Sequence, residues 1–199
     1  MPPVERVIYR RDGLEIGAFR CPPQRRDFRH AGQIRDHCTF VFPRTAVRIR
    51  QHGAPAFAAD AGTVAFYNPL QPYEREALDP TGDCCEWFAL DAALAAEIAR
   101  AADPRGRTHD DAPFRFTHGP SDAQTYLAQR ALSEALARGR ALDPLTVEEA
   151  VFGLLAAVLH QAASARGART ASTMRERWPS TGSGGRTRAA TAGPGPGRA

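Results

Sequence analysis

The chain has 199 residues, and its 26 basic and 22 acidic side chains give a formal net charge of +4. This length favours one domain with appendages, and four cysteines without framework spacing exclude a disulfide scaffold and favour a reducing compartment. No apolar run approaches the roughly 20 residues that span a bilayer, and the N-terminus has no signal-peptide pattern. We therefore expect a cytoplasmic protein without membrane association.

The positive charge is concentrated at the C-terminus. Residues 1–165 contain 19 arginines and 21 acidic residues, whereas residues 166–199 contain 7 arginines and a single acid, Glu176. The main part of the chain is thus slightly acidic. The composition predicts no basic, nucleic-acid-binding face on a folded domain, although a basic tail can bind phosphates without sequence preference.

The first segments predict a β-hairpin. Val4 to Arg10 and Leu14 to Arg20 flank Asp12-Gly13, a strong turn dipeptide. The charged, aperiodic stretch 24–36 predicts a loop.

Residues 37–90 predict the strand-rich core. Short apolar runs separated by Gly, Pro, Asn and Asp cover residues 38–42, 46–51, 56–58, 63–67, 73–77 and 84–90. Within 46–51, Val47 and Ile49 alternate with Arg48 and Arg50, which places the arginines outside. This spacing predicts an antiparallel barrel or sandwich for residues 4–90.

Three helices are expected from Asp91 onward. Asp91 caps the first, which ends at Asp103-Pro104, and a second begins at Ser121 and ends at Gly139. The third begins at Asp143-Pro144. Its apolar stripe is so extensive that we expect a homodimer through it, with or without a contribution from the second helix. The expected interface residues are Val147, Val151, Leu154, Leu155, Val158 and Leu159.

The chain therefore divides into three predicted parts. Residues 1–90 form a β-barrel, residues 91–167 form a helical dimerisation segment, and residues 168–199 form a disordered tail rich in Gly, Pro and Arg.

No catalytic or metal-binding set is recognisable in the sequence. A cupin metal site needs two histidines spaced two residues apart on one strand, and no two of the six histidines have that spacing. The folded part also lacks a G-x-S-x-G nucleophile elbow and a Gly-rich phosphate loop. We assign no catalytic residue, metal ligand or cofactor, and we interpret Glu74, Glu76 and Glu86 as parts of solvated faces.

A mostly apolar cavity is expected between the sheets. Ligand pockets combine apolar walls with a few placed polar groups. Alternation places Phe66 and Trp87 on the wall, with Asn68 and Tyr73 as polar candidates.

Residues 37–90 resemble the effector-sensing domain of AraC/XylS-type bacterial transcription regulators. The similar stretches are Phe40 to Arg44, Val64 to Asn68 followed by Tyr73 to Arg75, and Gly82 to Ala89, with Leu145 to Ala150 in the helical part. The resemblance covers roughly residues 4–165. It implies a cupin-like barrel of the jelly-roll type that binds a small effector, helices that dimerise, and a C-terminal part with two helix-turn-helix units.

The chain departs from that family after Arg166. Its last 33 residues lack the apolar periodicity of even one helix-turn-helix. We expect no sequence-specific DNA binding by this chain alone. A frameshift or truncation near residue 168 would explain the composition, and a natural disordered tail is the alternative. Such a chain could also form heterodimers with full-length relatives.

Two functional hypotheses follow. The first is the effector-sensing and dimerisation part of such a regulator, binding an unidentified small molecule. The alternative is a free-standing cupin-like small-molecule binder or metal-dependent enzyme.

Overall fold

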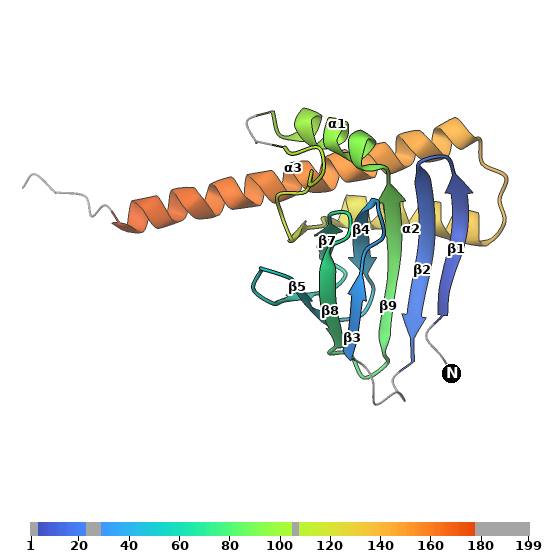
Figure 1. The fold of residues 1–199 in the computed structure, drawn as a ribbon, viewed down its shortest axis with the longest axis horizontal. Helices are drawn as coiled ribbons and strands as arrows, with labels where there is room; N and C mark the ends of the chain where they lie inside the picture. The colour runs from blue at the N-terminus through green and yellow to red at the C-terminus, as the bar shows by residue number, and fades with distance from the viewer. Residues whose placement is uncertain (1–3, 23–28, 105–107, 178–199) are drawn as a thin grey trace, which may run out of the picture.

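The computed structural model describes residues 4–22, 29–104 and 108–177 (Figure 1). Side chains are described except at residues 4, 29–30 and 169–177. In chain order the elements are β1 (Val4–Arg11), β2 (Leu14–Cys21), β3 (Arg29–Gln33), β4 (Cys38–Pro43), β5 (Val47–Gln51), β6 (Phe57–Ala59), β7 (Thr63–Tyr67), β8 (Pro72–Ala77), β9 (Asp83–Leu90), α1 (Ala92–Ala102), β10 (His118–Pro120), α2 (Ala123–Ala137) and α3 (Pro144–Arg177).

The strands form two antiparallel sheets. The larger sheet has the order β1-β2-β9-β4-β7-β10, and the smaller has the order β3-β8-β5-β6. Strands β2 to β9 alone give two four-stranded layers, β2-β9-β4-β7 and β3-β8-β5-β6, in which most strands pair with partners distant in sequence. This is the jelly-roll arrangement that cupins share. The predicted β-plus-α, cupin-like fold is confirmed.

One strand lies where the sequence predicted a loop. Strand β3 (Arg29–Gln33) falls within the charged stretch 24–36 and pairs antiparallel with β8 along its whole length. It is an edge strand, so its stability comes from backbone hydrogen bonds to β8 more than from an apolar face. Alternation of apolar residues therefore gave no signal for it.

The larger sheet is covered on both faces. Its inner face meets the smaller sheet, where Val41, Ala65 and Cys85 pack with Val47 and Ile49. Its outer face meets the helices, through a core that includes Phe40, Phe42, Val64, Phe66 and Phe88 together with the buried stripe of α3. Three of these rings interlock, since Phe40 stacks on Phe88 at 5.0 Å and Phe42 contacts both edge-on. The helices thus share a core with the barrel.

The helices start at or within one residue of the predicted positions. Asp91 precedes α1, but its side chain makes no capping hydrogen bond. Asp122 caps α2 by accepting a hydrogen bond from the Thr125 amide at 2.8 Å, one residue later than the predicted start at Ser121. Asp143 accepts one from the Thr146 amide at 3.1 Å before α3, as expected for an Asp-Pro start.

The third helix differs from expectation in two ways. It continues to Arg177, past the start of the tail that was predicted to be disordered, because no proline interrupts it before Pro179. The remainder of that tail, 178–199, lies outside the described residues. In addition, the six residues predicted to form a dimer interface are all at most 6% exposed within the single chain, because they pack on the outer face of the larger sheet.

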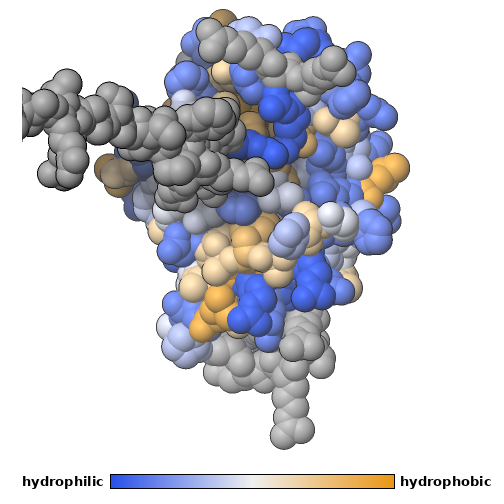
Figure 2. Space-filling model, turned by 90° about the vertical axis from the view of Figure 1, so that its left-hand side faces the viewer, coloured by the Kyte–Doolittle hydropathy of each residue, from blue (hydrophilic) through white to orange (hydrophobic). Residues whose placement is uncertain are grey.

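Residues 144–168 of α3 are long and apolar enough to cross a membrane by length and composition alone. The buried stripe of α3 instead packs into the core that the helices share with the larger sheet, as a core helix does. Figure 2, turned to face the end from which α3 projects, shows apolar residues in small groups interspersed with polar ones.

Candidate functional site

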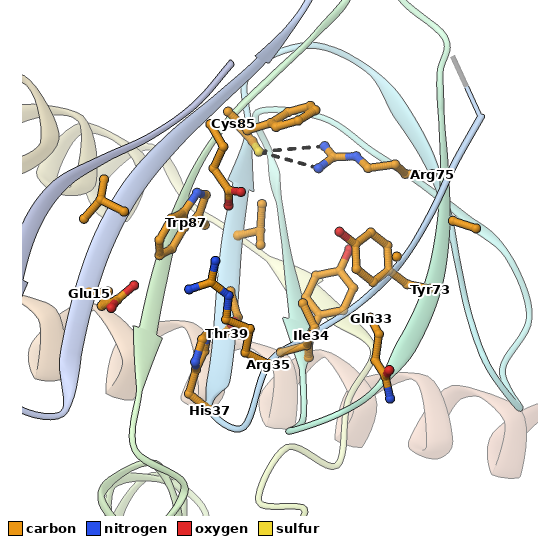
Figure 3. A pocket seen from close by; sticks show the side chains of 17 residues that line it. Glu15, Gln33, Ile34, Arg35, His37, Thr39, Tyr73, Arg75, Cys85 and Trp87 are labelled. Carbon is orange, nitrogen blue, oxygen red and sulfur yellow. Dashed lines mark hydrogen bonds between the residues drawn. The ribbon is translucent and has the colours of Figure 1, made fainter. Parts of the chain in front are cut away.

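A cavity of about 470 Å³ lies between the two sheets (Figure 3). Its lining comes from β1, β2, β4, β7 and β9 of the larger sheet, from β3 and β8 of the smaller sheet, and from the segment 34–37. The lining residues are Glu5, Val7, Glu15, Phe19, Ala31, Gly32, Gln33, Ile34, Arg35, His37, Thr39, Val41, Tyr67, Tyr73, Arg75, Cys85 and Trp87. This volume suits a small organic ligand.

Strand alternation decides which side chains face the cavity. On β9, Cys85 and Trp87 point inward, whereas Glu86 and Phe88 point to the helices. On β4, the neighbour of β9, Thr39 and Val41 point inward. Val41 is directly paired with Trp87, so Thr39 is a diagonal neighbour of Trp87 on the same face.

Aromatic rings form much of the wall. Tyr67 and Tyr73 meet edge-on with centroids 5.1 Å apart. The indole of Trp87 lies directly over Gly17, where a Cβ atom, if the residue had one, would lie 2.3 Å from the ring. Glycine at position 17 therefore leaves the space that the indole occupies.

A buried ion pair connects the two sheets at the cavity. Arg75 extends from β8 toward β9, where its Nη2 lies 2.6 Å from Oδ2 and 2.7 Å from Oδ1 of Asp83. Its guanidinium also contacts the Cys85 Sγ at 3.7 Å and covers the Phe19 ring at 4.8 Å. Burial opposes the charge on Arg75, but Cys85 and Asp83 raise its pKa above the ordinary value. Burial raises the pKa of Cys85 to about 11, so this thiol is protonated at neutral pH.

Several buried polar atoms of the wall have no hydrogen-bond partner among the described residues. These are Thr39 Oγ1, Trp87 Nε1 and Arg75 Nε. A buried donor or acceptor without a partner carries a free-energy cost of about 1–3 kcal/mol. A bound molecule that supplied the missing partner would remove part of that cost.

The remaining charged groups lie around the segment 34–37. Glu15 pairs with Arg10 at 2.8 Å, and both Glu15 and His37 also border a second hollow of about 480 Å³ formed around residues 10–15 and 89–91. Desolvation lowers the pKa of His37, although nearby Glu15 opposes the shift. The imidazole is therefore uncharged at neutral pH.

Only part of the predicted pocket set meets in the cavity. Trp87 and Tyr73 line it. Phe66 faces the opposite side, where it packs on Phe114 with centroids 5.4 Å apart. Asn68 follows β7 and exchanges two 2.9 Å hydrogen bonds with the backbone of Phe114. Phe66 shares its face of β7 with Val64, and the opposite face, which carries Tyr67, is the one that lines the cavity.

Sequence reasoning missed Arg75 and Thr39 as cavity residues. Arg75 lies between Glu74 and Glu76, which were interpreted as parts of a solvated face, and it was not assigned to the pocket although Tyr73 was. Glu74 is exposed, and Glu76 pairs with Arg48 at 3.1 Å, as that interpretation requires. The available signal was Tyr73, which shares the face of Arg75 and has a large ring that favours burial.

Glu86 was also misassigned as solvated. Its side chain is 2% exposed and pairs with Arg44, and with Arg130 of α2 at 2.9 Å. Arg130 in turn contacts Glu134. The partner from α2 lies 44 residues away, so no local pattern announces the pair.

Among residues 4–22, 29–104 and 108–177, no three His, Cys, Asp or Glu side chains form a group that could hold a metal ion.

No protein-family model matches the sequence, and no curated protein matches it. Among solved structures, a putative mannose-6-phosphate isomerase from Ralstonia eutropha JMP134 is similar over 46% of this chain and 87% of its own, at 12% identity and a TM-score of 0.38. KdgF from Halomonas sp. is similar over 45% of this chain and 82% of its own, at 13% identity and a TM-score of 0.38.

A Klebsiella pneumoniae protein with a double-stranded beta-helix domain is similar over 44% of this chain and 76% of its own, at 13% identity and a TM-score of 0.38. Similarities at this level carry no argument about function, which rests on the cavity itself.

Proposed function

We propose that the jelly roll binds a small organic molecule in the cavity between its sheets, and that the chain is the sensing part of an AraC/XylS-type transcription regulator. The observation that carries the binding function is the cavity of about 470 Å³, whose wall contains Thr39 Oγ1 and Trp87 Nε1 without partners among the described residues. Aromatic surface supplies affinity, and a few polar groups supply orientation.

The regulator assignment is the finer part of the proposal. It rests on the resemblance of residues 40–44, 64–68, 73–75 and 82–89 to the sensing domain of that family. Each of these stretches carries cavity residues, Val41, Tyr73 and Trp87 among them. The contact between Glu86 and Arg130 also fits a sensor, because it joins a strand of the cavity wall to a helix. We assign the chain a binding role and no catalytic one.

Tryptophan fluorescence tests the binding function directly. The second tryptophan, Trp178, is replaced by Phe, so that Trp87 is the only reporter. Screening small aromatic and alicyclic metabolites should then give saturable quenching. The matched control is Trp87→Phe with Trp178 retained, which should show no saturable change. If no compound quenches Trp87, and calorimetry also detects no binding, the proposed function is wrong.

The enzyme alternative has its own test. Metal analysis of the purified protein should give less than one equivalent of iron, manganese or zinc. Stoichiometric metal that resists dialysis would instead favour the cupin-like enzyme.

The DNA and dimer proposals concern the helical part and the tail. Titration of promoter and scrambled DNA at two salt concentrations should give equal affinities that fall together with salt. A promoter preference at physiological salt would contradict the proposal. Sedimentation should show a homodimer, whose contact surface lies outside the buried stripe of α3.

A further inference from the structure

The cavity contains one deeply buried cation among its described lining residues, and that cation is already neutralised. Arg75 is 10% exposed and Asp83 is 2% exposed, with oxygen–nitrogen distances of 2.6 and 2.7 Å. We propose that the Arg75–Asp83 pair makes this cavity selective for uncharged aromatic ligands that carry an oxygen acceptor, and that Asp83 determines this selectivity. The proposal rests on the binding function proposed above.

Charge balance is the first step of the argument. A carboxylate ligand would lose its hydration on entry and would need an uncompensated cation in return. Arg75 does not offer one, because the carboxylate of Asp83 already pairs with it at 2.6 Å. An anionic ligand would therefore gain less from Arg75 than it loses in hydration.

Hydrogen-bonding capacity is the second step. Arg75 uses Nη2 for Asp83, while Nη1 has the distant thiol of Cys85 at 3.9 Å and Nε meets no acceptor in the described part of the chain. Thr39 Oγ1 also has no hydrogen-bond partner among the described residues, and Thr39 is 5% exposed. These groups can donate to a carbonyl or hydroxyl oxygen, which suits a neutral ligand.

The rest of the cavity wall also favours an uncharged aromatic ligand. The rings of Phe19, Tyr67, Tyr73 and Trp87 all line the cavity and favour a flat ring. Arg75 already covers one face of Phe19, so that face is closed to a cationic ligand. Glu15 pairs with Arg10, and the remaining charged side chains of the lining, Glu5 and Arg35, are exposed to solvent.

The test compares three probes of matched shape by isothermal titration calorimetry: 2-naphthamide, 2-naphthoate and 2-naphthylmethylammonium. The wild-type chain should bind the amide about tenfold more tightly than either ion. In Asp83→Asn the guanidinium loses its counter-charge but keeps a hydrogen-bond acceptor of similar shape. We expect naphthoate to gain about tenfold in affinity there, while the amide changes about twofold or less.

Two controls accompany this variant. Asp110→Asn removes an equal charge from an exposed side chain that does not line the cavity, and it should keep the wild-type order. The double variant Arg75→Gln/Asp83→Asn removes both charges and should also prefer the amide. The double variant can still be measured if Asp83→Asn alone fails to fold, because replacing both residues leaves no unpaired charge in the buried site.

The outcomes separate this inference from the function on which it rests. Tight binding of naphthoate or of the cation to the wild-type chain, or an unchanged order in folded Asp83→Asn, would overturn the selectivity while leaving the binding function intact. Failure of all three probes to bind the wild-type chain, together with no response of Trp87 in the metabolite screen, would overturn both.

Discussion

Glu86 and Trp87 are adjacent in sequence, yet they lie on opposite sides of the larger sheet: Trp87 lines the cavity, and Glu86 pairs with Arg130 of α2. A displacement of β9 at Trp87 would therefore also displace the adjacent Glu86 and its contact with α2. This relationship makes β9 the strand that connects the cavity to the helices.

Removing Glu86 should destabilise the chain measurably. Glu86→Ala should lower the free energy of unfolding by about 2 kcal/mol, below the roughly 3–5 kcal/mol typical of a fully buried pair, because Arg44 and Arg130 reach solvent. Glu76→Ala, which breaks the exposed pair with Arg48, should cost less than about 1 kcal/mol. Urea unfolding measures both. Equal losses in the two variants would contradict the burial of Glu86.

Two glycine substitutions should have opposite effects. Gly17→Ala places a methyl group within 2.3 Å of the Trp87 indole, so it should cost about 1–3 kcal/mol and shift the tryptophan emission. Gly153→Ala lies on α3 with no described atom within 4 Å of the new Cβ, so it should stabilise the helix by up to about 1 kcal/mol. Thermal unfolding followed by circular dichroism distinguishes them. A neutral Gly17→Ala would show that the indole does not pack there.

The stripe of α3 should behave as core. Leu155 is fully buried, and Leu155→Ala should cost about 2–5 kcal/mol. The exposed Leu127 of α2 is the matched control, and Leu127→Ala should change stability by less than about 0.5 kcal/mol. For the same reason, Leu154→Glu with Val158→Glu should unfold the chain. A well-folded, monomeric double variant would instead support the original expectation of a dimer interface on this face.

Acid should weaken the fold through His37. Burial lowers the pKa of this imidazole in the folded chain, whereas in the unfolded chain the pKa has its ordinary value near 6.5. Below about pH 6.5 the unfolded chain therefore binds the proton more readily than the folded chain. Its contribution is complete above pH 6.5 and is lost as the pH falls toward the folded value. Between about pH 7.5 and about pH 5.5, the wild-type chain should therefore lose more stability than His37→Gln. The matched control is His160→Gln, which replaces an exposed histidine of α3.

Local patterns in the sequence were sufficient for most elements but insufficient for their environment. Alternation located β5 and correctly placed Arg48 and Arg50 outside, and Asp-Pro located the start of α3. Where a sheet is covered on both faces, however, both faces of a strand are apolar, and alternation cannot say which face meets a cavity. Phe66 and Tyr67 illustrate this, since both are at most 3% exposed.

The same limitation applies to the helix stripe and to the charges. An apolar face on α3 indicates burial without naming the surface that covers it, and that surface is the outer face of the larger sheet. Glu86 and Arg75 have partners supplied by other elements, Arg130 and Asp83. Such long-range pairs leave no periodic signal in the chain.

Because the larger sheet is covered on both faces, the register of β9 determines which of its side chains meet the cavity and which meet the helices. Cys85 and Trp87 face the cavity, whereas Glu86 and Phe88, which alternate with them, face the helices. Inserting one residue after Cys84 would exchange the two faces of the strand. The Glu86 carboxylate would then point into the aromatic cavity, and the Trp87 indole would point into the core beneath the helices. A single substitution in this strand changes only one of these two regions, whereas an insertion or deletion of one residue would disrupt the cavity and the helix-covered core together.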